Sequence, residues 1–308
     1  MNRATVGHFV DYARGVQRHF GDRVVSITTH NEPWVIAILG HETGVFAPGI
    51  RHRASAIQVA HHLLLSHGLA LQALRADGCR AALGIVLNLS PIHPASASAA
   101  DQHAARIEDG RLLRWFLDPL FRACYPEDIL DHLGSDAPRV AAGDMAAIST
   151  PLDFLGVNYY SRTVVSANGP VDAATLGHPV TDMGWEVYPD GLSELLQRLH
   201  QDYPVPPLFV TENGGAFQDL LVNGRVADGG RVDYIARHIE AVAHAIRRGV
   251  PMGGYMVWSL LDNFEWASGY LKRFGIVHVD YTTQQRTWKD SALWYRDFLR
   301  SQRPGRAA

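Results

Sequence analysis

The sequence predicts an α/β protein of the (β/α)8 TIM-barrel type, and two observations carry that prediction. Short apolar segments alternate with longer segments of helical periodicity, the pattern of a parallel sheet covered by helices on both faces. Polar, acidic and aromatic residues directly follow the apolar segments, as they do where barrel strands end at one common mouth. No glycine-rich phosphate fingerprint follows the first strand, which disfavours a dinucleotide-binding sheet.

Each element follows from local periodicity and from the residues that interrupt it. Gly21 ends the first helix, and Asp77-Gly78 ends the second. The expected elements are a helix over 8–20, a buried strand over 24–28, a helix over 54–76, a strand over 81–87, a helix-rich stretch over 97–133, a strand over 154–157, a helix over 192–199, a strand over 208–210, a helix over 232–248 and a strand over 254–257.

Composition indicates a soluble globular protein, with 47% hydrophobic and 19% charged residues. The net charge of −3 gives no electrostatic reason to expect nucleic acid or an anionic membrane as a partner. With only Cys79 and Cys124, a disulfide framework is not expected. Residues 1–15 lack the apolar core of a signal peptide, and no apolar run has the length of a membrane span. We therefore expect a cytoplasmic protein.

Two glutamates stand out because each follows a predicted strand and has an asparagine beside it. Glu32 lies in Thr-His-Asn-Glu-Pro-Trp (29–34), and Glu212 lies in Val-Thr-Glu-Asn-Gly-Gly (210–215). Retentive hydrolysis of a glycosidic bond needs one carboxylate to attack the anomeric carbon and another carboxyl group to protonate the leaving oxygen. Either glutamate alone could be an ordinary loop carboxylate, but the pair of motifs favours that chemistry.

A third motif supplies the aromatic surface that a sugar site needs. The segment Trp-Ser-Leu-Leu-Asp-Asn-Phe-Glu-Trp (258–266) follows the last predicted strand and ends in Glu265 and Trp266. Sugars present apolar C–H faces as well as hydroxyl edges, so tryptophan beside a carboxylate suits them. Tryptophan there could also belong to the core, but two tryptophans flanking acidic residues favour binding.

These motifs, with Asp-Phe-Leu-Gly-Val-Asn-Tyr-Tyr (153–160), resemble the signatures of family 1 glycoside hydrolases, the β-glucosidase family. They occur in the family's order, and the resemblance extends over essentially the whole chain. It implies a retaining β-glucosidase that releases terminal non-reducing β-D-glucosyl residues through a glycosyl-enzyme intermediate. The implied substrate is a β-glucoside or a short β-linked oligosaccharide, and the implied mechanism needs no cofactor.

The resemblance also implies a role for each site residue. Glu32 would be the acid/base, and Glu212 would be the nucleophile. The implied substrate-binding residues are Asn31 at the sugar 2-hydroxyl, Asn158, Tyr160 as the hydrogen-bond donor to Glu212, Trp258 as the platform under the sugar, Glu265 and Trp266 at its outer hydroxyls, and Phe274 in the same pocket. An acidic Glu265 would repel a sugar phosphate, which favours unphosphorylated substrates.

The resemblance further implies that strands four to eight of the barrel are present and that the first three are absent. Residues 1–308 would then form a single glycoside hydrolase barrel domain, truncated at its N-terminus. Five strands cannot close a barrel of this geometry, because strand number, tilt and shear are linked. Two alternatives to an independently active enzyme therefore stay open. One is a non-catalytic fragment with weak sugar binding, and the other is a barrel completed by an oligomer or by a complementing N-terminal fragment.

His30 and the other histidines raise two smaller questions. His30 stands where the family usually has an apolar residue, so we expect a packed, neutral imidazole, with tuning of Glu32 as the alternative. The sixteen histidines lack the ligand spacing of a structural metal site, and we expect no bound metal.

Overall fold

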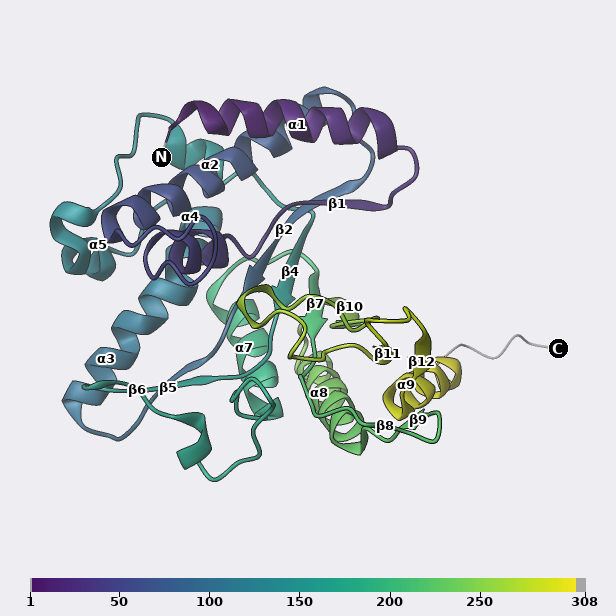
Figure 1. The fold of residues 1–308 in the computed structure, drawn as a ribbon. Coiled ribbons are helices and arrows are strands. Elements are labelled where there is room, and N and C mark those ends of the chain that lie inside the picture. The colour runs from purple at the N-terminus through teal and green to yellow at the C-terminus, as the bar shows by residue number, and fades with distance from the viewer. Residues whose placement is uncertain (1, 303–308) are drawn as a thin grey trace.

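The computed structural model of the chain describes residues 2–302 and is built around a parallel sheet (Figure 1). Within those residues the sheet has five strands in the order β1-β2-β4-β7-β10, and all four neighbouring pairs are parallel. The strands are β1 (Ser26–Asn31), β2 (Ala82–Asn88), β4 (Phe154–Asn158), β7 (Leu208–Asn213) and β10 (Met252–Val257). The predicted parallel α/β sheet is confirmed, and in the described residues it is open rather than closed into a barrel.

Long amphipathic helices connect the strands. Helix α1 (Ala4–Phe20) packs against α2 (Arg53–Ala76), and α7 (Pro189–Asp202) packs against α8 (Gly229–Arg247). In Figure 1, the α1–α2 pair lies above β1 and β2, and the α7–α8 pair lies below β4 and β7. The helices predicted over 8–20, 54–76, 192–199 and 232–248 are therefore present, mostly longer than their sequence patterns indicated, because helix ends carry weak signals.

Shorter elements connect and cover this framework. Between β2 and β4 they are β3 (Ile92–Pro94), α3 (Ala99–Asp109), η2 (Gly110–Arg114), α4 (Trp115–Arg122), α5 (Glu127–Leu133), η3 (Gly134–Asp136) and α6 (Asp144–Ile148). Elsewhere they are η1 (Val35–Leu39), β5 (Thr163–Ser166), β6 (Gly169–Pro170), η4 (Ala173–Thr175), β8 (Leu221–Val222), β9 (Arg225–Val226), η5 (Trp266–Ser268), β11 (Val277–Val279), β12 (Arg286–Trp288) and α9 (Asp290–Ser301).

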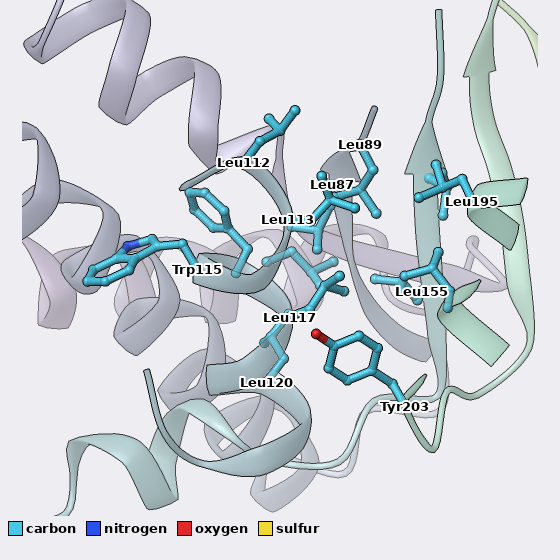
Figure 2. Close-up of a cluster of buried hydrophobic side chains, with 14 of the residues drawn as sticks. Leu87, Leu89, Leu112, Leu113, Trp115, Leu117, Leu120, Leu155, Leu195 and Tyr203 are labelled. Atoms are coloured by element: carbon cyan, nitrogen blue, oxygen red, sulfur yellow. The ribbon is translucent and has the colours of Figure 1, made fainter. Parts of the chain in front are cut away.

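The main hydrophobic core lies between the sheet and the helices α4 and α7. Figure 2 shows Leu155 of β4 and Leu195 of α7 beside side chains of α4 such as Leu117. Trp115, which is 2% exposed, stacks on Tyr125 with ring centroids 4.2 Å apart. Burial of a large apolar side chain stabilises the fold by about 1.5–3 kcal/mol, so this core holds the middle of the sheet rigidly in place.

The two edge strands differ from expectation. The prediction of a buried strand over 24–28 is wrong, because β1 begins at Ser26, its residues alternate in exposure, and Val25 is 90% exposed. Strand β10 is also partly exposed, with Met256 at 50%. The apolar sequences predicted strands with two covered faces, and only the inner strands β2 and β4 have them.

Two further findings concern the chain as a whole. No helix within residues 2–302 is long and apolar enough to cross a membrane. Cys79 and Cys124 are both free thiols.

Candidate active site

The carboxyl ends of the strands carry β-bulges, and these bulges position the site. The ladder between β1 and β2 shifts register between Thr28 and Asn31. The β4–β7 ladder shifts between Val157 and Asn158, and the β7–β10 ladder shifts just before Val257. A bulge locally increases strand twist and turns side chains out of their regular alternation. All three bulges lie next to predicted site residues.

Glu32 has an unusual backbone conformation at the end of β1. Its φ angle is +52°, in the left-handed region that non-glycine residues seldom adopt. The conformation is held from both sides, since Glu32 N–H donates to the carbonyl of Val86 at 2.9 Å and its own carbonyl accepts from Val35 N–H at 2.9 Å. Strained backbone of this kind costs about 1–3 kcal/mol and persists where the surrounding structure enforces it.

Asn158 connects the two predicted carboxylates. Its Nδ2 donates to Glu32 Oε1 at 2.7 Å and to Asn31 Oδ1 at 3.0 Å. Thr211 Oγ1 donates to Asn158 Oδ1 at 2.6 Å, which fixes which end of the amide faces Glu32. Asn158 is also the ladder partner of Glu212 in the β4–β7 pair. A single buried amide therefore donates to Glu32 and lies beside Glu212.

The two carboxyl groups have different surroundings. Burial raises the pKa of Glu32 to about 7, and the negative charges of Glu212 and Glu265 add to the rise, while the hydrogen bond from Asn158 opposes it. Burial also raises the pKa of Glu212, but hydrogen bonds from Tyr160, Asn158 and Asn31 oppose that rise. Glu32 thus keeps a proton near neutral pH, and Glu212 has the partners that stabilise a carboxylate.

Tyr160 is the direct partner of Glu212. Its hydroxyl donates to Glu212 Oε2 at 2.5 Å, as the family resemblance implied. Burial, followed by the Glu212 charge, raises the pKa of Tyr160 well above its ordinary value. The phenol therefore keeps its proton and remains a donor near neutral pH.

A cavity of about 870 Å³ opens at these strand ends. Its lining includes all nine side chains singled out from the sequence: Asn31, Glu32, Asn158, Tyr160, Glu212, Trp258, Glu265, Trp266 and Phe274. Phe274 is 2% exposed and meets the Tyr160 ring edge to face at 6.1 Å. Trp266 lies at the rim, 64% exposed, and stacks on Phe46 at 5.6 Å.

Close backbone approaches hold the aromatic wall of the cavity. Trp258 directly follows β10, and its N–H donates to the carbonyl of Asn213, the last residue of β7, at 2.9 Å. A Cβ on Gly214 would come within 1.8 Å of the Trp258 carbonyl oxygen. Only glycine permits this approach, which explains the Asn-Gly-Gly sequence after Glu212.

Some lining residues were not predicted from the sequence. Arg162 and Glu186 line the cavity and form a bidentate ion pair at 2.7 and 2.9 Å, with Glu186 1% exposed. Trp185 lines the same wall and lies 5.4 Å from the Tyr160 ring. The polar sequence that continues past Tyr160 is a weak signal for Arg162. Glu186 lies in a long connection, where neighbouring residues give no clue to its partner.

His30 is packed and neutral. It is 8% exposed, its Nε2 bonds Ser66 Oγ at 2.8 Å, and its ring stacks on Phe9 at 4.2 Å. Burial lowers its pKa to about 4. Among residues 2–302, no group of three or more His, Cys, Asp or Glu side chains could hold a metal ion.

A parallel α/β sheet with two buried, unequal carboxyl groups and an aromatic-walled cavity at its strand ends defines a hydrolase of the glycosidase class. The glycosyl hydrolase family 1 profile matches residues 1–304. β-Glucosidase A of Thermotoga maritima is 42% identical over 306 residues, covering 97% of this chain and 69% of that relative. The β-glucosidase of an Agrobacterium strain is also 42% identical over 306 residues, covering 96% and 66%.

Solved structures give the same result. A β-glucosidase from Exiguobacterium marinum superposes with a TM-score of 0.94 at 42% identity, covering 98% of this chain and 71% of that one. The family 1 β-glucosidase of Thermotoga maritima in complex with isofagomine lactam gives 0.93 at 42% identity, covering 97% and 69%. The chain belongs to glycosyl hydrolase family 1.

Proposed function

We propose that this chain is a retaining β-glucosidase that hydrolyses terminal non-reducing β-D-glucosyl residues by double displacement, with Glu212 as the nucleophile and Glu32 as the acid/base. The observation that carries the proposal is that two buried carboxyl groups line one cavity with different partners: Glu32 accepts from Asn158, and Glu212 accepts from Tyr160. Retaining glycosidases hold their carboxyl groups about 5 Å apart, closer than inverting enzymes do. Asn158 donates to Glu32 and is the ladder partner of Glu212, which supports the closer arrangement.

The proposed reaction has two steps. In the first, the Glu212 carboxylate forms a bond to the anomeric carbon while Glu32 gives its proton to the glycosidic oxygen, and the aglycone leaves as an alcohol. In the second, the Glu32 carboxylate takes a proton from a water molecule while the water oxygen forms a bond to the anomeric carbon, and the bond between that carbon and Glu212 breaks. Glu32 is reprotonated and Glu212 is again free. The high pKa of Glu32 suits the first step near neutral pH.

The other lining residues have proposed binding roles. Asn31 contacts the sugar 2-hydroxyl, Trp258 lies under the sugar ring, and Phe274 closes the pocket beside it. Glu265 and Trp266 bind the outer hydroxyls, and Asn158 orients Asn31 and both carboxyl groups. Glu265 lines the same cavity, and its carboxylate would repel a sugar phosphate, which supports a preference for unphosphorylated sugars.

We also propose that residues 1–308 form one domain that functions in the cytoplasm, and that its strands correspond to the fourth to eighth strands of a (β/α)8 barrel. The strand order supports this, because each strand pairs with its neighbour in sequence, as barrel strands do. In the active protein the free edges of β1 and β10 would be covered by a second copy of the chain or by a complementing N-terminal fragment. The exposure of Val25 and Met256 supports that pairing.

The test is release of nitrophenol from a nitrophenyl β-glucoside by the purified chain. We expect Glu212→Gln to lower kcat by about 10³-fold or more, because an amide cannot attack the anomeric carbon. The matched control is Glu240→Gln, the same change at an exposed position of α8, which should leave the rate unchanged. NMR spectra recorded during the reaction should show that the sugar released first is the β-anomer.

Three results would contradict the proposal: full activity of Glu212→Gln, an α-anomer as the first product, or no hydrolysis by the wild type in any oligomeric state. The pH profile adds a check. Since Glu32 must be protonated for the first step, kcat/KM should fall as the pH rises through about 7.

A further inference from the structure

Tyr160 has few backbone anchors for a residue that must align with Glu212. Strand β4 ends at Asn158, so Tyr160 lies beyond the regular ladder of the sheet. The neighbouring Tyr159 N–H donates to the Glu212 carbonyl at 2.9 Å. The Tyr160 carbonyl accepts a hydrogen bond from a side chain of another element, the hydroxyl of Tyr234 on α8, at 2.8 Å.

The Tyr234 hydroxyl also lies against the residue that follows Glu212. Asn213 Nδ2 donates to the Tyr159 carbonyl at 2.7 Å and to the Tyr234 oxygen at 3.3 Å. Asn213 Oδ1 accepts from the Tyr255 hydroxyl of β10 at 2.6 Å. Asn213 and Tyr234 are both 0% exposed, so no water competes for these bonds.

The direction of every hydrogen bond in this cluster is determined. Tyr255 donates to Asn213, the amide of Asn213 donates to Tyr234, and Tyr234 then has its single proton left for the Tyr160 carbonyl. Tyr160 in turn donates its phenol proton to Glu212. Hydrogen bonds thus connect Tyr255 of β10, Asn213 of β7, Tyr234 of α8 and Tyr160 to the Glu212 carboxylate, and each donor in the series has an acceptor.

The ring of Tyr234 is held as firmly as its hydroxyl. His238, one helical turn further along α8, stacks on it with centroids 3.9 Å apart, and His238 Nδ1 bonds the Tyr234 carbonyl at 2.7 Å. Burial lowers the pKa of His238 to about 3, so that ring is neutral. Burial also raises the pKa of Tyr234 far above its ordinary value, so its hydroxyl keeps its proton.

We propose that Tyr234 is a positioning residue for the reaction: by holding the Tyr160 backbone it keeps the Tyr160 phenol aligned with the Glu212 carboxylate. This rests on the proposed role of Glu212 as the nucleophile. Tyr234 touches neither carboxyl group in the hydrogen bonds observed, so its influence passes through Tyr160. A buried phenol that only filled space would influence stability but not the ionisation of Glu212.

Tyr234→Phe removes the hydroxyl and keeps the ring. The hydrogen bond from Tyr160 lowers the pKa of Glu212, so a less well aligned Tyr160 lets that pKa rise. The acidic limb of the kcat/KM profile, set by Glu212, should move to higher pH by about half a unit, and kcat should fall on the order of tenfold. The matched control is Tyr203→Phe, which removes another buried phenol, donating to Asp118 Oδ1 at 2.7 Å and outside this cluster. It should leave the acidic limb in place.

A double-mutant cycle decides whether Tyr234 acts through Tyr160. If it does, Tyr234→Phe should have little further effect on kcat in a Tyr160→Phe background. The proposal would be overturned if the two substitutions lowered kcat by independent, additive amounts. It would also be overturned if Tyr234→Phe left the acidic limb of the kcat/KM profile where it is in the wild type. Should Tyr234→Phe not fold, as judged by circular dichroism, Tyr255→Phe tests the same donor chain one step earlier and should shift the limb in the same direction.

A readout without substrate separates this inference from the proposed function. The pKa of the Glu212 carboxyl group can be followed by ¹³C NMR in protein labelled at glutamate, with Glu212→Gln identifying the resonance. Tyr234→Phe should raise that pKa even if the chain hydrolyses no glucoside. An unchanged Glu212 pKa would overturn the positioning role, whereas an active Glu212→Gln variant would overturn the proposed function instead.

Discussion

At the scale of single residues, two glutamates acquire different properties from their neighbours. Both are buried in the same cavity, but Tyr160 donates to Glu212, and Asn158 and Asn31 also lower the pKa of Glu212, while Glu32 has one donor and two repelling charges. The orientation of Asn158 is itself determined by Thr211, which occupies its oxygen. The different surroundings of the two carboxyl groups thus depend on neighbouring side chains that hold no acidic proton themselves.

His30 gives a prediction about stability and pH. Its pKa is about 4 in the folded protein against an ordinary 6.5, so below pH 6.5 the unfolded chain binds a proton that the folded chain does not. The free energy of unfolding therefore falls as the pH drops from 6.5 towards 4, by about 3 kcal/mol from this residue. His30→Phe, which keeps the stacking on Phe9, should lose that part of the dependence.

Urea denaturation at pH 7 and pH 4.5 measures the effect. The control is His103→Phe, the same substitution at an exposed histidine of α3, which should retain the wild-type dependence on pH. The explanation fails if His30→Phe loses as much stability between the two pH values as the wild type does.

Short motifs were enough to single out Glu32 and Glu212, because each lies at a strand end with a neighbouring asparagine, and the structure brings both into one cavity. Their roles as acid/base and nucleophile stay predictions. Tyr234 has no such signal, because it lies on the buried face of α8, where an aromatic side chain is expected to be core. Its hydroxyl reaches the Tyr160 carbonyl only in the folded protein, so no local sequence pattern indicates this hydrogen bond.

At the scale of elements, a buried ionic cluster joins the connections that carry the aromatic wall. Lys289 Nζ, just before α9, donates to the carboxylates of Asp219 and Asp262 and to the Gly275 carbonyl at 2.6 Å. All three charged side chains are 0% exposed. Gly275 follows Phe274, whose carbonyl accepts from Ser259 N–H at 3.2 Å, so the cluster is connected to two residues beside the cavity.

Lys289→Met should lower the free energy of unfolding by about 3 kcal/mol. Removing one partner leaves buried negative charge with less compensation, which costs about 3–5 kcal/mol, and Arg231 and Arg273 still pair with the two aspartates. Lys272→Met is the control, since the only other lysine donates to a backbone carbonyl, that of Asp182. Chemical denaturation compares the two, and equal losses of stability would argue against the cluster.

The same scale shows where strand prediction failed. Apolar sequence before β1 and in β10 predicted buried strands like β2, but Val25 and Met256 are exposed. The sequence pattern shows how apolar a strand is, whereas the burial of its side chains depends on which other strands and helices pack against it. In the part of the chain that the structure describes, strands β2, β4 and β7 have a hydrogen-bonded strand on each side, and β1 and β10 have one. The position of a strand in the sheet, central or at an edge, depends on tertiary structure and cannot be predicted from a short sequence segment.

At the scale of the whole molecule, the open sheet has two free edges. Strands β1 and β10, labelled in Figure 1, stand at the two ends of the strand order, and within residues 2–302 no strand pairs with the outer side of either. Such edges readily pair with another chain, especially where apolar side chains surround them. Val25 at 90% exposure and Met256 at 50% are side chains of that kind. The sheet itself therefore favours association.

We expect the purified chain to sediment as a dimer or larger species at micromolar concentration, and Val25→Lys to shift it towards the monomer. A lysine at a strand edge opposes pairing, because its charge would have to be desolvated. Val140→Lys places the same charge at another exposed valine, before α6 and away from the sheet, and should leave the distribution unchanged. Sedimentation velocity over a concentration series distinguishes the three proteins. If the wild type is monomeric throughout, or if both lysine variants dissociate equally, pairing through the edge of β1 is excluded and the proposed covering by a second copy fails with it.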